Sequence, residues 1–275
     1  MKIVRRITFR STPEICRELE TLGIRFDPAN VWFDISESDP AWPRLFQIIR
    51  SMGFLPIAHT EFTQKEIESA LWLQVQPTWH HGYPKPDMDF GYLQATYNCS
   101  NCCEKCGSGY EQAAPFRFSS EPKWGKKSIL QLNWVFDEYF VKPELWEKVF
   151  RPLGIPCREV VQHRSGAPLT TVVQLDVNAI ATGPTHLGAH PFEICPKCGR
   201  KRFLPFTRGF FPPLADYPDA HIFKTSELFG SGASSWRAVI ISQELCSALR
   251  AERALGVNFV PLANDVSEVT PPLSP

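Results

Sequence analysis

Four cysteines occur in two short motifs whose spacing is typical of a metal site. The motifs are Cys103-Glu-Lys-Cys106-Gly107 and Cys195-Pro-Lys-Cys198-Gly199, which begin 92 residues apart. Each motif presents two thiolates on one tight turn, and the glycine after the second cysteine allows the positive φ that points backbone N–H groups at sulfur. Because a closed structural zinc site takes four ligands, each motif supplies half of a site. The sequence therefore predicts one Zn²⁺ bound by Cys103, Cys106, Cys195 and Cys198, which would connect the two halves of residues 89–265.

The same residue types could serve other chemistry. Iron in a rubredoxin-like site takes the same ligands, so the sequence does not separate zinc from iron. Cys99 and Cys102 precede the first motif, and either could replace a ligand, although the match to the second motif favours Cys103 and Cys106. A thioredoxin-like redox site has one CxxC at a helix start, whereas two copies occur here, each followed by glycine. Four histidines are further candidate ligands but are expected in loops: His80, His81, His186 and His190.

Composition and charge narrow the class of protein. The 275 residues include 29 lysines and arginines and 29 aspartates and glutamates, so the net charge is zero. A neutral chain has no general attraction to nucleic acid or to an anionic membrane. The sequence has no apolar run of membrane-spanning length, and its first residues carry charges where a signal peptide would be apolar. We therefore expect a cytoplasmic protein with no membrane partner, whose nine cysteines are reduced or bound to metal.

The elements that must position the cysteines begin with a small N-terminal domain. Strands are predicted at 2–9, 31–35, 54–59 and 71–75, with helices that end at Gly23 and Gly53 and a helical turn at 64–70. Ser11-Thr12-Pro13 has the hydroxyl cap and early proline of a helix start. This order predicts a small α/β domain over residues 1–80 with a ferredoxin-like fold.

The rest of the chain contains a repeat. Phe140-Val141-Lys142-Pro143-Glu144-Leu145 leads to Gly154, and Ile240-Ile241-Ser242-Gln243-Glu244-Leu245 leads to Gly256. The offset is 100 residues at Phe140 and Ile240 and 102 residues at the two glycines. Each copy predicts a strand, a helix and a strand. The predicted fold class is therefore α+β, with a duplicated strand-helix-strand region over 89–265 and a frayed tail at 266–275.

No motif indicates an enzyme. The chain lacks a Walker loop, a GxSxG elbow and an HExxH sequence, and no cysteine has a local catalytic signature. The cluster Arg200-Lys201-Arg202 beside the second motif leaves one alternative, a zinc-ribbon protein that binds nucleic acid or has a regulatory role. The neutral net charge makes nucleic acid the less favoured partner.

The paired CxxCG turns, together with the Pro143-Glu144-Leu145 to Gly154-Ile155-Pro156 block, resemble the double-CXXCG motif family of myxobacteria. The resemblance covers residues 90–262 and rests on the two cysteine motifs; Trp residues expected near such turns are absent at the first one. Some members of that family are regarded as immunity proteins for Sit-type polymorphic toxins. The resemblance thus implies a non-enzymatic protein that binds and neutralises a cognate toxin, with a structural zinc. It indicates neither the toxin-facing surface nor the oligomeric state.

Overall fold

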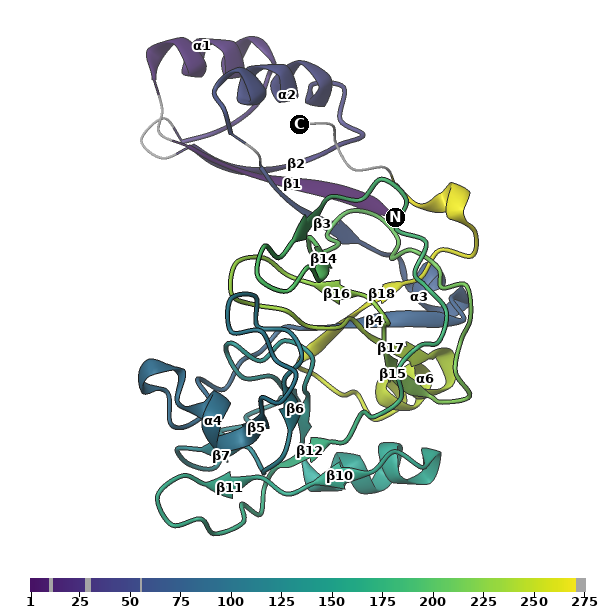
Figure 1. Ribbon diagram of the computed structural model, residues 1–275. Helices are drawn as coiled ribbons and strands as arrows, with labels where there is room; N and C mark the ends of the chain where they lie inside the picture. The colour runs from purple at the N-terminus through teal and green to yellow at the C-terminus, as the bar shows by residue number, and fades with distance from the viewer. Residues whose placement is uncertain (10–11, 28–30, 55, 271–275) are drawn as a thin grey trace. The chain divides into compact units, whose positions relative to one another are not determined.

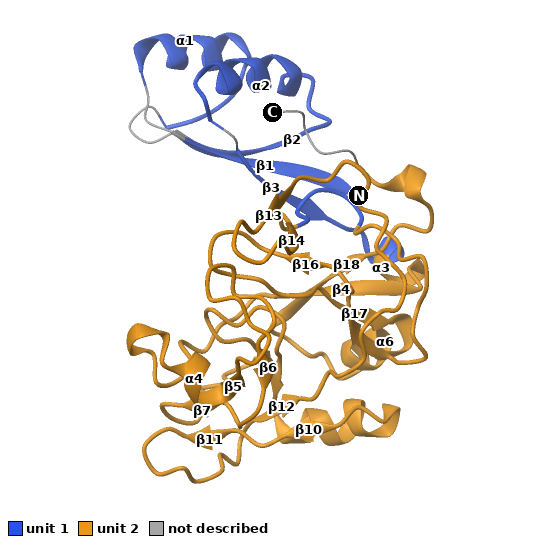
Figure 2. Cartoon of the chain, viewed as in Figure 1, with its two compact units in different colours: residues 1–66, 206–210 blue, residues 67–205, 211–275 orange. Residues whose placement is uncertain are grey.

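The computed structural model describes residues 1–9, 12–27, 31–54 and 56–270, and it has a mixed α+β fold (Figure 1). The chain divides into two compact units (Figure 2). Unit 1 consists of residues 1–66 and 206–210, and unit 2 of residues 67–205 and 211–275. Among the described residues no helix combines the length and the apolar character that a bilayer crossing requires.

The described residues of unit 1 form a three-stranded antiparallel sheet with two helices. Its elements are β1 (Lys2–Phe9), α1 (Pro13–Thr21), β2 (Val31–Ser36), α2 (Trp42–Ser51) and β3 (Ile57–Glu61), and the strand order is β2-β1-β3. The hydroxyl of Thr12 caps α1 by accepting from the N–H of Ile15, as the sequence predicts. Both helices lie on the same face of the sheet in Figure 1 and bury Leu19, Leu45 and Ile49 against it.

An ion pair lies on the same face of this sheet as the helices, because Arg5 is two residues from the core residue Ile7 on β1 and its guanidinium lies 5.6 Å from the ring centroid of Trp42 in α2. Arg5 is only 7% exposed, and its guanidinium lies 2.6 Å from the carboxylate of Glu37. The segment 206–210 completes unit 1, because Arg208 also pairs with Glu37 and the N–H of Gly209 donates to the hydroxyl of Thr60. A segment distant in sequence is thus tied to the sheet by charge-assisted hydrogen bonds.

The strand predicted at 71–75 forms as β4 (Trp72–Pro77), but it does not join the sheet of unit 1. It lies between β17 (Val239–Ser242) and β18 (Val257–Pro261), antiparallel to both. Its alternating side chains Leu73 and Val75 are buried in the core of unit 2. Unit 1 therefore has three described strands, one fewer than a ferredoxin-like domain.

Unit 2 contains two four-stranded sheets with the same arrangement. In one the order is β18-β4-β17-β15, where β15 is Ile222–Lys224. In the other it is β10-β12-β9-β8, formed by Cys157–Arg158, Val173–Leu175, Phe140–Val141 and Ile129–Leu130. All of these pairings are antiparallel. In each sheet a helix connects two parallel strands that are separated by one antiparallel strand.

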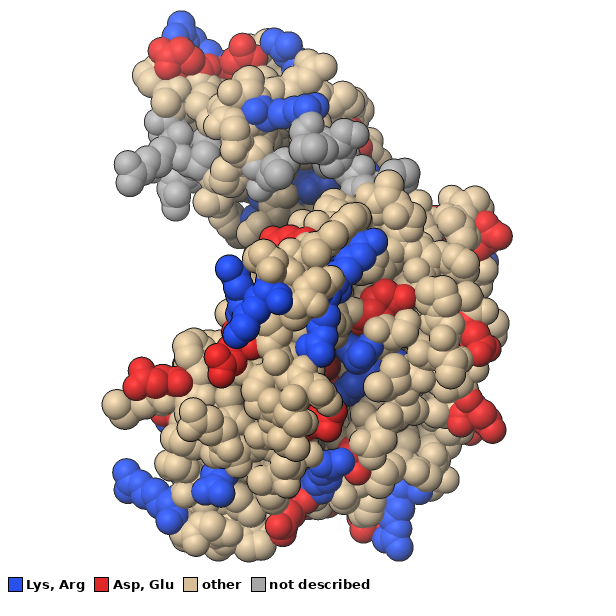
Figure 3. Space-filling view, in the orientation of Figure 1, with Lys and Arg blue, Asp and Glu red and all other residues tan. Residues whose placement is uncertain are grey.

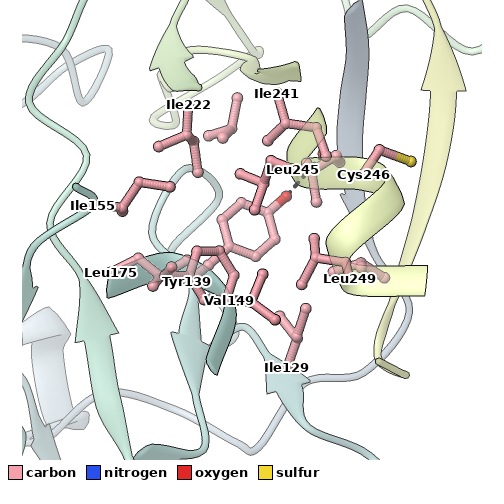
Figure 4. Close-up of a cluster of buried hydrophobic side chains, with 14 of the residues drawn as sticks. Ile129, Tyr139, Val149, Ile155, Leu175, Ile222, Ile241, Leu245, Cys246 and Leu249 are labelled. Atoms are coloured by element: carbon pink, nitrogen blue, oxygen red, sulfur yellow. Dashed lines mark hydrogen bonds between the residues drawn. The ribbon is translucent and has the colours of Figure 1, made fainter. Parts of the chain in front are cut away.

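The two connecting helices share one core. The first begins at Pro143 as α5 (Pro143–Leu145) and continues through a π-helical segment η2 (Trp146–Phe150) and a 3₁₀ turn η3 (Arg151–Leu153), ending at Gly154 with a left-handed φ of 71°. The second is α6 (Gln243–Ala251), capped by Ser242. Figure 4 shows Tyr139 in the middle of this core, with its hydroxyl donating to the carbonyl of Val75 at 2.9 Å.

The remaining described elements are short. They are α3 (Gln64–Ser69), η1 (Met88–Phe90), α4 (Tyr92–Thr96), β5 (Tyr97–Asn98), β6 (Glu111–Gln112), β7 (Arg117–Phe118), β11 (Val161–Gln162), β13 (Phe192–Ile194), β14 (Lys201–Phe203), β16 (Leu228–Phe229) and η4 (Val266–Glu268). The cysteine motifs lie between β5 and β6 and between β13 and β14. The predicted tail begins with η4, and its last five residues lie outside the described part of the chain.

Candidate metal centre

The two cysteine motifs form matching turns. In the first, the N–H of Cys103 donates to the carbonyl of Ser108 at 2.8 Å, and the N–H of Gly107 donates to the carbonyl of Cys103 at 2.7 Å. The second repeats this pattern 92 residues later, from Cys195 to Arg200 at 3.0 Å and from Gly199 to Cys195 at 2.9 Å. Each turn is bracketed by an antiparallel strand pair, β5 with β6 and β13 with β14. The local geometry of both is therefore set by their own hydrogen bonds.

The structure brings the four predicted cysteines together. The sulfur of Cys103 lies 3.8 Å from that of Cys195, and the sulfur of Cys106 lies 3.7 Å from that of Cys198. All four sulfur atoms lie within 4.8 Å of one another. A tetrahedral ion with zinc–sulfur bonds of about 2.3 Å would place its ligands about 3.8 Å apart. The cluster therefore has the size and the donor set to hold a metal ion.

Burial and acidity differ among the four cysteines. Cys103, Cys106 and Cys195 are buried and Cys198 is exposed. The backbone N–H groups of Cys198 and Lys197 lower the pKa of Cys195 to about 6. For Cys198 the N–H of Arg200 favours the thiolate, but desolvation and the neighbouring sulfurs outweigh it and raise the pKa to about 11. Four thiolates so close together repel each other, and a divalent cation relieves this repulsion.

The first turn fits tightly against the loop before β17. A Cβ atom at Gly107 would lie 2.2 Å from the carbonyl oxygen of Ala233, and the glycine has a φ of 70°. Gly199 has the same φ, but nothing lies within 4 Å of its would-be Cβ. The hydroxyl of Ser235 also donates to the carbonyl of Cys106 at 2.6 Å. Gly107 is thus required both for its left-handed φ and for the close contact with the carbonyl of Ala233, whereas Gly199 is required for its left-handed φ alone.

Two arginines hold the turns together, a role that the sequence analysis missed. Arg200 donates to the carbonyls of Ser108 at 3.0 Å and Asn101 at 2.8 Å. Arg202, only 4% exposed, donates to the carbonyl of Cys106 at 3.2 Å and to carbonyls of the 232–234 loop. The sequence suggested these side chains as nucleic-acid ligands. Their acceptors are main-chain carbonyls far along the chain, and no sequence pattern records such contacts.

The other candidate ligands lie elsewhere. Cys99 and Cys102 form a disulfide with each other, so the expectation that all nine cysteines are reduced or bound to metal is wrong for these two. His81 is close to the carbonyl of Ser120, and the ring of His190 contacts the carbonyl of Leu204 at 2.9 Å. Cys246 belongs to the apolar core, where burial raises its pKa to about 11. Among the described residues the cluster of four is the group found with metal-ligand geometry.

Comparison with known proteins adds no assignment. No family model matches the chain, and no curated protein matches it.

Proposed function

We propose that this chain is a non-enzymatic binding protein, stabilised by one structural zinc ion, that neutralises a cognate polymorphic toxin in the bacterial cytoplasm by covering part of its surface. The observation that carries the proposal is the four-cysteine cluster built from two distant turns. With four protein ligands a tetrahedral site is closed, which is typical of structural zinc and leaves no position for a catalytic water. The resemblance to double-CXXCG immunity proteins supplies the partner class.

The choice of zinc rests on ligand chemistry. A tetrahedral set of four thiolates suits zinc or iron, and zinc needs no redox partner. Apparent zinc-binding free energies in such sites are on the order of 10 kcal/mol or more, comparable with the whole stability of a domain. The ion would therefore hold the halves of unit 2 together more strongly than any single side-chain contact.

The internal duplication is part of the same proposal. The two four-stranded sheets share one strand order, and Val141, Leu145 and Val149 occupy the same core as Ile241, Leu245 and Leu249, each 100 residues later. The two cysteine turns share a hydrogen-bond pattern at an offset of 92 residues. These correspondences support descent from one repeated unit.

Co-expression tests the function. The chain is produced with the product of a neighbouring toxin gene, and a stable complex together with protection of toxin-expressing cells is expected. A Cys195→Ser variant should lose both, whereas a Cys16→Ser variant, changed far from the cluster in sequence, should retain both. Absence of a complex and of protection with the wild-type chain would refute the immunity role.

A nucleic-acid-binding or regulatory role is the second candidate. One observation favours it: the ammonium group of Lys201 lies over the exposed ring of Phe192, and Lys197 is exposed nearby. However, Arg200 and Arg202 are engaged with main-chain carbonyls, and both signs of charge occur across the face in Figure 3. Salt-dependent retention on DNA that disappears in Lys197→Gln/Lys201→Gln would favour this candidate, because those changes spare the arginines.

A further inference from the structure

A second feature of unit 2 is a large open cleft beside the cysteine cluster. Its volume is about 1110 Å³, and its lining comes from the 89–112, 134–138 and 228–237 segments among others. Gly107, Ser108 and Arg200 line one side, so the cleft adjoins the first cysteine turn. Ligand sites are typically concavities of about 300–1,000 Å³, and this cleft is slightly larger than that range.

Aromatic side chains line this cleft and remain exposed. Trp134 is 36% exposed, Phe136 is 38% exposed and Phe90 is 52% exposed. The ring of Trp134 lies 4.6 Å from that of Phe90, and Phe136 lies 4.5 Å from Trp236. Exposed, grouped aromatic rings on a monomer indicate an interaction surface, and such rings are the commonest anchors of binding energy.

Unusual backbone conformations gather at the same place. Within the described ranges, four residues other than glycine have a left-handed φ, and three of them line the cleft: Asp89, Phe90 and Trp134. For a bulky residue such as Trp134, with φ of 68°, this conformation costs on the order of 1 kcal/mol or more. The fold thus holds the aromatic side chains of Phe90 and Trp134 in the cleft although their backbone conformations are unfavourable.

The charges in the cleft are unequal. Six acidic and four basic residues line it. Arg158 pairs with Asp176 at 2.7 Å, and Lys224 pairs with Glu138. The other two basic residues, Arg200 and Arg237, donate to main-chain carbonyls and so support the walls. Asp89, Glu104 and Glu111 are exposed, so the cleft presents acidic groups to an incoming ligand.

We propose that this cleft is a docking site for a basic segment of a partner polypeptide, with an arginine or lysine side chain lying over Trp134 and close to Asp89. A cation over an aromatic face gains about 0.5–2 kcal/mol, and arginine is the cation most often found there. The exposed carboxylates of Asp89, Glu104 and Glu111 attract such a segment and repel nucleic acid. In naming the partner as a toxin segment, the inference rests on the proposed function.

The test uses a fluorescent hexa-arginine peptide with blocked termini as the probe and the full-length, zinc-loaded chain. Saturable binding is expected, and Trp134→Asn combined with Glu111→Lys should weaken it at least tenfold. Asparagine is chosen because it tolerates a left-handed φ better than most residues other than glycine, so the backbone is preserved. Zinc content and melting temperature of the variant check its fold.

A matched control carries the same changes outside the cleft. Phe192→Asn combined with Glu159→Lys also replaces one exposed aromatic ring and reverses one exposed charge. This control should bind the probe as the wild type does. Absence of saturable binding, equal loss in both double variants, or tighter binding of a single-stranded oligonucleotide at the same site would overturn the proposal.

The toxin experiment distinguishes failure of the docking site from failure of the immunity role. If the wild-type chain captures the toxin and the cleft variant captures it equally well, the docking site is wrong and the immunity role stands. If the probe binds in the cleft but no toxin is captured, the docking site stands and the immunity role fails.

Discussion

Gln74 and Gln174 occupy equivalent positions in the two four-stranded sheets of unit 2. Gln74 is paired with Ile240 on one side and Val260 on the other, and Gln174 is paired with Phe140 and Arg158. Gln74 lies before the first cysteine turn, but the other three strands of its sheet follow the second turn. Gln174 follows the other three strands of its sheet along the chain. If unit 2 is divided at residue 165, the first part therefore contributes β4 to the sheet of the second part, and the second part contributes β12 to the sheet of the first.

This exchange predicts how a divided chain behaves. A break between Ser165 and Gly166, in an exposed turn, leaves each fragment without the middle strand of its own sheet and with only two of the four cysteines. We expect neither fragment 1–165 nor fragment 166–275 to bind zinc tightly alone, and the mixture to form a 1:1 complex with one zinc. Size-exclusion chromatography with metal analysis measures this. A 166–275 fragment that folds as a monomer with its own zinc would contradict the exchange.

The two cysteine-turn glycines form a matched pair. Gly199→Ala should cost about 1 kcal/mol, the penalty for a side chain at left-handed φ. Gly107→Ala has the same penalty plus a clash with the carbonyl of Ala233, and should cost roughly 2 kcal/mol more. Urea unfolding of the zinc-loaded variants measures both. Equal costs would mean that the loop before β17 does not pack against the first turn.

Removal of one cluster cysteine should loosen unit 2. Cys195→Ser is expected to lower zinc affinity by several orders of magnitude and to lower the melting temperature, whereas Cys246→Ser changes a core residue and should leave the metal bound. Metal analysis after dialysis against a chelator distinguishes the two. Comparable zinc retention in both variants would refute the four-cysteine assignment.

Thiol counting gives an independent check. Seven cysteines are outside the Cys99–Cys102 disulfide. We expect seven reactive thiols in denaturant with chelator, and five fewer under native conditions, because metal protects the four cluster thiols and burial protects Cys246. Nine thiols under denaturing conditions would show the disulfide to be reduced in solution, and no protected group of four would argue against a bound ion.

Arg202 should matter for stability although it binds no metal. Arg202→Met leaves several carbonyls near the first turn without their donor and should cost about 3 kcal/mol. Lys201→Met is the control on the same strand, because Lys201 is exposed and should cost about 0.5 kcal/mol or less. Thermal unfolding of both variants measures these costs. Similar decreases in melting temperature would show that the carbonyl contacts of Arg202 contribute little to stability.

Sequence reasoning succeeded where structure is local. The start of α1 follows from Thr12 and Pro13, and the cysteine turns follow from their spacing, because each depends on neighbours within a few residues. The partner of β4 could not be predicted, since alternating Leu73 and Val75 suit either sheet. The contacts of Arg202 could not be predicted either, because they depend on how main-chain segments that are distant in sequence come together. The shape of the cleft depends on the same long-range packing.

The ion pairs of Glu37 predict a pH-dependent stability of unit 1. Burial alone would raise the pKa of this carboxyl, but hydrogen bonds from Arg208 and Arg5 outweigh it and hold the pKa below its usual value. A lowered folded-state pKa contributes stability that is fully present above the unfolded value, about 4.3, and is lost as pH falls through the folded value. We therefore expect unit 1 to become less stable as pH falls below about 5.

Glu37→Gln should cost about 2 kcal/mol of stability at pH 7 and flatten this pH dependence. Urea unfolding at pH 7, 5 and 4 tests it, with Glu20→Gln, an exposed glutamate of α1, as control. A wild-type slope preserved in Glu37→Gln would assign the acid sensitivity to other carboxyl groups.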